Sequence, residues 1–79
     1  MITLDLAHLS REALEGIVRE RCAQYGAVVH IVIIHDSQTY NFALASVEMA
    51  TADQRQVLLR HLGDYVVDDA VVIRLEQAT

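Results

Sequence analysis

The chain has 79 residues, 53% of them hydrophobic and 22% charged, and its formal net charge is −5. This length predicts a single domain over residues 1–79, and the high hydrophobic share excludes an intrinsically disordered chain. The acidic balance opposes long-range attraction to nucleic acid, because phosphates are bound by basic surface.

The first part of the chain predicts a strand followed by a helix. Residues 2–6 alternate between apolar and polar side chains, as in a half-buried strand. The helix is predicted over about residues 10–25, with Ser10 as its N-cap and Gly26 as its stop signal. Its apolar stripe repeats every three or four residues and consists of Leu14, Ile17, Val18, Cys22 and Tyr25.

Two strands are predicted next. Residues 27–35 are rich in Val and Ile, which indicates a strand that is apolar on both faces. A polar turn is expected at residues 35–39, before a strand at residues 40–49. Alternation along this strand places Tyr40, Phe42 and Leu44 on the same face.

A second helix and a further strand follow. Thr51 and Gln54 have the spacing of a capping box, which predicts a helix over about residues 51–62. The Asp-Asp pair at 68–69 indicates a turn, and residues 70–76 alternate as a strand.

The order of these elements is strand, helix, strand, strand, helix, strand. With right-handed crossovers it predicts an α+β fold of the ferredoxin-like, split βαβ type. We expect a four-stranded antiparallel sheet in the order 4-1-3-2, with both helices on one face. The second and fourth strands would then lie at the edges.

Sequence motifs of catalysis and metal binding are missing. No serine or cysteine stands beside a histidine in a nucleophile motif, and Cys22 lies on an apolar stripe, where a thiol is inert. A single cysteine excludes both an internal disulfide and the Cys-x-x-Cys pair of heavy-metal-binding domains with this element order. We therefore expect no enzyme, no metal site and no cofactor.

Two other families share the element order. An acylphosphatase needs a glycine-rich anion loop after the first strand, and residues 6–10 contain no glycine. The small-molecule-sensing ACT domain typically has a Pro-Gly turn there, and this chain contains no proline. A regulatory domain that binds a small molecule is therefore a weaker alternative.

Three stretches together resemble the RNA recognition motif (RRM), as a degenerate member. Residues 24–28 are similar to the end of the family's first helix and its turn into strand two. Residues 41–47 resemble the octamer motif on strand three, and residues 62–65 and 73–75 resemble the end of helix two and strand four. The resemblance covers nearly the whole chain and implies a nucleotide-binding sheet that holds single-stranded RNA.

The resemblance also implies which residues would contact RNA, because bases stack on aromatic side chains of strands one and three in this family. Phe42 keeps the first stacking position, whereas Leu44 and Thr3 occupy the other two. Tyr40 is a substitute platform, and Arg74 would contact a phosphate. The loss of two platforms removes roughly 2–6 kcal/mol of binding energy, at about 1–3 kcal/mol per base.

These departures support a second hypothesis, in which the domain has lost RNA binding and is a protein-interaction or homodimerisation module. An apolar sheet face suits a protein partner. The strand at 27–35 would lie at an edge without the lysine or proline that usually blunts an edge strand. We expect a homodimer with Val32 and Ile34 at the interface.

Location follows from the same composition. The longest apolar run is broken by His30 and is too short to span a bilayer, and Asp5 and His8 interrupt the first ten residues, so they do not resemble a secretory signal. We expect a cytoplasmic protein with no membrane partner.

Overall fold

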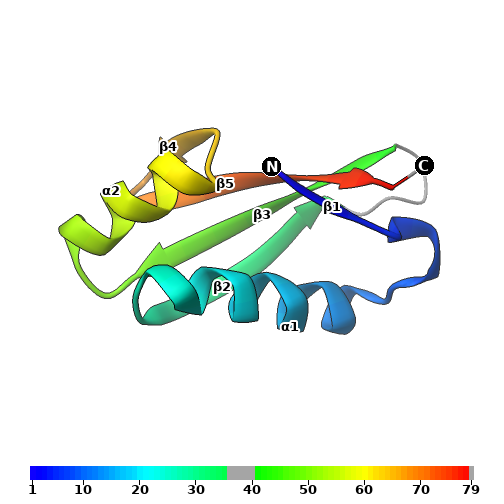
Figure 1. Ribbon diagram of the computed structural model, residues 1–79, viewed down its shortest axis with the longest axis horizontal. Coiled ribbons are helices and arrows are strands. Elements are labelled where there is room, and N and C mark those ends of the chain that lie inside the picture. The colour runs from blue at the N-terminus through cyan, green and yellow to red at the C-terminus, as the bar shows by residue number, and fades with distance from the viewer. Residues whose placement is uncertain (36–40, 79) are drawn as a thin grey trace.

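The computed structural model describes residues 1–35 and 41–78 and shows an α+β fold with two α-helices and five strands (Figure 1). Both predicted helices and all four predicted strands are present within a few residues of their expected bounds. The expected turn at residues 35–39 lies almost entirely outside the described residues. The elements are β1 (Ile2–Leu4), α1 (Arg11–Cys22), β2 (Val28–His35), β3 (Phe42–Met49), α2 (Ala52–His61), β4 (Tyr65–Val67) and β5 (Ala70–Gln77).

The two predicted helix caps are confirmed. The Oγ of Ser10 accepts a hydrogen bond from the backbone N–H of Ala13 at 3.1 Å, and Thr51 Oγ1 accepts one from Gln54 at 3.1 Å. Each bond satisfies a backbone donor in the first turn that has no partner within the helix. Helix α1 continues into a short 3₁₀ turn, η2 (Ala23–Tyr25), before the chain reverses at Gly26.

The sheet is mixed, and its strand order differs from the prediction. The order is β1-β5-β3-β2, with β4 beside β5. Strand β5 pairs parallel with β1 and antiparallel with β3, which pairs antiparallel with β2. The predicted order 4-1-3-2 and the wholly antiparallel sheet are therefore wrong, whereas the edge position of β2 is confirmed.

Burial explains why β5, and not β1, lies inside the sheet. Val71, Ile73 and Leu75 are fully buried on one face of β5, and Val72 is also buried on the other. Strand β1 has only three residues, and its Thr3 is exposed. Because an interior strand is covered by neighbours on both sides, the longer and more apolar β5 fits that position better.

Two short elements were not predicted from the sequence. Strand β1 ends at Leu4, and the chain turns through a 3₁₀ helix, η1 (Leu6–His8), where the prediction continued the strand to residue 6. Strand β4 forms a tight hairpin with β5, in which Tyr65 pairs with Val72. The predicted turn at Asp68 and Asp69 is confirmed as the loop of this hairpin.

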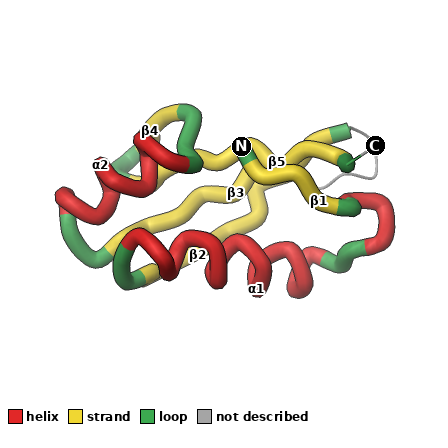
Figure 2. The backbone as a smooth tube through the Cα atoms, viewed as in Figure 1, coloured by secondary structure: helices red, strands yellow, loops and turns green. Residues whose placement is uncertain are grey.

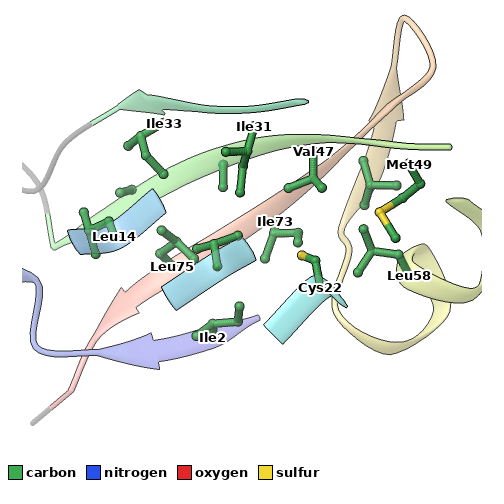
Figure 3. Packing of buried hydrophobic residues seen from close by; sticks show 14 of the residues in the cluster. Ile2, Leu14, Cys22, Ile31, Ile33, Val47, Met49, Leu58, Ile73 and Leu75 are labelled. Atoms are coloured by element: carbon green, nitrogen blue, oxygen red, sulfur yellow. The ribbon is translucent and has the colours of Figure 1, made fainter. Parts of the chain in front are cut away.

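The core lies between the helices and one face of the sheet (Figure 3). Leu14, Val18 and Cys22 of α1 and Leu58 of α2 join the same buried cluster as inward-facing residues of β1, β2, β3 and β5. Both helices therefore pack on one side of the sheet, as predicted. Connections between the elements are mostly short (Figure 2), and helix α1 lies alongside β2 (Figure 1).

Candidate functional site

The face of the sheet opposite the core is not covered by any helix in the described part of the chain. Strand register identifies its members, because directly paired residues point to the same side of a sheet. Ser46 pairs with both Val32 and Val72, and Leu44 pairs with Arg74. We call this surface the open face. With the paired neighbours and the exposed Ile34 it comprises Thr3, His30, Val32, Ile34, Phe42, Leu44, Ser46, Glu48, Tyr65, Val72, Arg74 and Glu76.

The structure brings four of the five predicted RNA-contacting residues to this face. Thr3 pairs with Glu76, which also pairs with Phe42 on its other side, and Leu44 and Arg74 form the neighbouring row. Tyr40 lies outside the described residues. Thr3 shares this face with the other three residues although β1 lies at the edge of the sheet. Glu76 of β5 lies between them, since it pairs with Thr3 on one side and with Phe42 on the other.

Arg74 and Phe42 contact each other. The guanidinium carbon of Arg74 lies 4.0 Å from the centroid of the Phe42 ring, a cation–π contact. Its Nε donates to Glu76 Oε1 at 2.5 Å. The ring predicted to stack a base is thus partly covered by the cation predicted to bind a phosphate, and a carboxylate already neutralises that cation.

The predicted interface residues are exposed on the β2 side of the open face. Val32 keeps 42% of its surface accessible and Ile34 keeps 53%. Their neighbours in sequence, Ile31 and Ile33, point to the opposite side and are buried in the core. Strand β2 is therefore apolar on both faces, as predicted, but only one of those faces is covered.

Tyr65, which is not among the predicted site residues, also joins the open face through its pairing with Val72. The sequence does carry a signal for it, since a two-residue Asp-Asp turn lies between two apolar triplets, 65–67 and 70–72. Three residues are too few for alternation to be recognised, so the sequence predicts no strand over residues 65–67.

A polar cluster outside the open face fixes the end of β1. His8 Nδ1 lies 2.8 Å from Asp5 Oδ2, and Gln77 Nε2 donates to Asp5 Oδ1 at 3.3 Å. The hydrogen bonds to Asp5, that from His8 foremost, hold the pKa of its carboxyl below the ordinary range. Gln77 Oε1 also accepts from the N–H of Ala7 at 3.1 Å. Because Gln77 belongs to β5, the cluster ties β1 to its neighbour in the sheet.

Cys22 has no reactive environment. Its side chain is fully buried in the core, and burial raises the pKa of its thiol to about 11. The thiolate, which is the nucleophilic form, is therefore strongly disfavoured at neutral pH.

Residues 1–35 and 41–78 show neither a metal-binding cluster nor a membrane-spanning helix. No three His, Cys, Asp or Glu side chains in this part of the chain gather as a metal ion would require. No helix in it has the length and apolar character needed to cross a membrane. Comparison of the chain with protein-family models, with curated proteins and with solved structures gave no match.

Proposed function

We propose that this domain is a protein-interaction module that associates with a second copy of itself through the β2 side of its open face. The observation that carries the proposal is the exposure of Val32 and Ile34 on a sheet face that no helix among the described residues covers. Apolar side chains gathered on one surface mark interaction sites, because their removal from water is favourable.

The distribution of charge supports a protein partner over RNA. Five of the six basic residues lie on the helices, which pack against the other side of the sheet: Arg11, Arg19, Arg21, Arg55 and Arg60. The sixth, Arg74, is paired with Glu76. Phosphate binding on the open face would therefore depend on one neutralised cation, whereas RNA-binding surfaces use several.

A second copy fits this surface better than a charged partner. In a twofold contact each patch meets its own counterpart, so the apolar side chains of Val32 and Ile34 would meet each other and bring no like charges together. The Arg74–Glu76 pair needs no complementary charge across the interface.

Sedimentation velocity at micromolar concentration tests the proposal. We expect a dimer for the wild type and a monomer for Val32→Lys, because a buried ammonium without a partner is strongly unfavourable. The matched control is Val66→Lys. Val66 is 39% exposed, close to the 42% of Val32, but its pairing with Val71 places it on the other side of the sheet. This control should remain a dimer.

RNA binding is the competing outcome. Fluorescence anisotropy with short random single-stranded RNA at low salt would detect it, and Phe42→Ala should then weaken binding by about 1–3 kcal/mol. A wild-type monomer that binds RNA and loses it with Phe42→Ala would replace the self-association proposal with the RRM-like function. A monomer that binds no RNA would also refute self-association.

A further inference from the structure

The two edges of the sheet are built differently. On one side of β5 the edge is divided between β1 and β4, which have three residues each, and β4 ends at the acidic turn of its hairpin. The other edge is β2, which is eight residues long and contains no Lys, Arg, Asp, Glu or Pro. An edge strand presents unpaired backbone N–H and C=O groups, and proteins usually blunt it by shortness, charge or proline. The first edge is blunted in this way. Strand β2 has irregularities in its pairing with β3 near its two ends, between Val28 and His30 and between Ile33 and His35, but it is long and lacks charge and proline, and the stretch between these irregularities is regular.

We propose that β2 pairs antiparallel with β2 of a second copy, about a twofold axis at Val32, so that the two sheets join into one. This inference rests on the self-association proposed above and specifies its geometry. The occupant of the edge is a second copy because β2 is uncharged apart from histidine, so that it can lie beside itself without like-charge contacts.

The alternation of side chains restricts the register. Residues directly opposite each other in an antiparallel pair point to the same face, so a twofold axis must pass through a residue and not between two. An axis at Val32 places Val32 opposite its own counterpart and His30 opposite Ile34. An axis at Ile31 would place Ile34 opposite Val28, which pairs with the inward-facing Met49 and so points to the other side.

This arrangement satisfies the edge of β2 and partly covers the apolar side chains beside it. Val32 and Ile34 gain neighbours across the axis, and the free backbone groups of β2 gain hydrogen-bond partners. Because a twofold axis between antiparallel strands is perpendicular to the sheet, both α1 helices would lie on one side and both open faces on the other. The pair therefore presents one continuous surface that carries two copies of the Phe42–Arg74 contact.

Single-cysteine substitutions test this geometry in the full chain. In the proposed register the Cα atoms of the two residues at 32 are about 4.5–5.5 Å apart, within the usual disulfide range. The two residues at 34 are offset by four positions along the strand, or roughly 14 Å. Under mild oxidation we expect Val32→Cys to form a covalent dimer and Ile34→Cys, on the same strand and face, to form none. The native Cys22 is buried and should not react in either variant.

Amide hydrogen exchange gives a second measurement that needs no substitution. In the dimer, N–H groups along the whole of β2 should be protected, whereas a free edge leaves every other one exposed to solvent. Equal crosslinking at positions 32 and 34, or a dimer with alternate unprotected β2 amides, would overturn edge pairing but leave self-association through the open face intact. A wild-type monomer would overturn both proposals.

Discussion

A side chain would clash at Gly26 but would fit at Gly16. Gly26 has a φ of 150°, a conformation that L residues rarely adopt, and a Cβ there would lie 2.5 Å from Cδ of Gln54. Gln54 Oε1 accepts a hydrogen bond from the N–H of Ala27 at 3.2 Å, so its side chain cannot move away without losing that bond. Gly16 lies in the exposed part of α1, and a Cβ there would meet nothing within 4 Å.

These environments predict changes of opposite sign in the free energy of unfolding. Gly26→Ala should lower it by about 1–3 kcal/mol, because the substitution adds backbone strain and displaces Gln54. Gly16→Ala should raise it by about 0.5–1 kcal/mol, because alanine is the better helix former. Urea denaturation followed by circular dichroism measures both. Similar stabilities for the two variants would contradict the assigned role of Gly26.

Among the elements, the β4–β5 hairpin has an unusual turn. Asp68 and Asp69 have φ values of 50° and 66°, the left-handed conformation that a two-residue hairpin loop requires. Asparagine and glycine adopt it more easily than aspartate. Arg55 Nη1 approaches the backbone carbonyl of Asp69 at 3.4 Å and its carboxylate at 3.5 Å, which ties the turn to α2.

The turn can therefore be improved. The double variant Asp68→Asn, Asp69→Gly should raise the free energy of unfolding by roughly 0.5–1 kcal/mol. Asparagine and glycine adopt the left-handed conformation with less strain, and this effect exceeds the conformational entropy that a glycine adds to the unfolded chain. The backbone contact of Arg55 is retained. Thermal denaturation would measure the gain. A lower midpoint than that of the wild type would mean that the contact of the Asp69 carboxylate with Arg55 stabilises the fold by more than the left-handed conformation of Asp68 and Asp69 destabilises it.

The elements also show where sequence patterns succeed. Both helices and four strands follow from local signals such as the caps at Ser10 and Thr51, and the structure confirms them. Strand order is not local. It depended on a competition between β1 and β5 for the interior of the sheet. Val72 lies on the open face through its pairing with Ser46, yet only 3% of its surface is exposed. Alternation along one strand does not reveal which neighbours that strand will have.

At the scale of the whole molecule, the cluster around Asp5 links stability to pH. Its folded pKa lies below the unfolded value, so it contributes stability at neutral pH that is lost as pH falls through the folded pKa. Asp5→Asn should destabilise the protein at neutral pH, and the difference from the wild type should shrink in acid. Urea denaturation at several pH values would show this, with the exposed Asp64→Asn as control. A difference that does not depend on pH would contradict the role of the carboxylate.

The membership of the open face was only partly visible in the sequence. Phe42, Leu44 and Arg74 could be assigned to one face from alternation and were found there. The contact between Arg74, Phe42 and Glu76 could not be predicted, because it depends on side-chain conformations across two strands. That contact changes the interpretation of the face, since it engages the groups that the RRM resemblance assigns to RNA.

The parallel pairing of β1 with β5 also has a kinetic consequence. Ile2 pairs with Leu75, so the pairing of the two strands closes a loop that contains nearly the whole chain. Strands β2 and β3, by contrast, are neighbours in sequence and can pair early. Closing a long loop costs entropy before any contact is gained, which delays such pairings in folding. We therefore expect β1 to dock last in folding. In amide hydrogen exchange, the amides of β1 should exchange when this strand detaches locally, whereas those of β3 should exchange only when the whole domain unfolds.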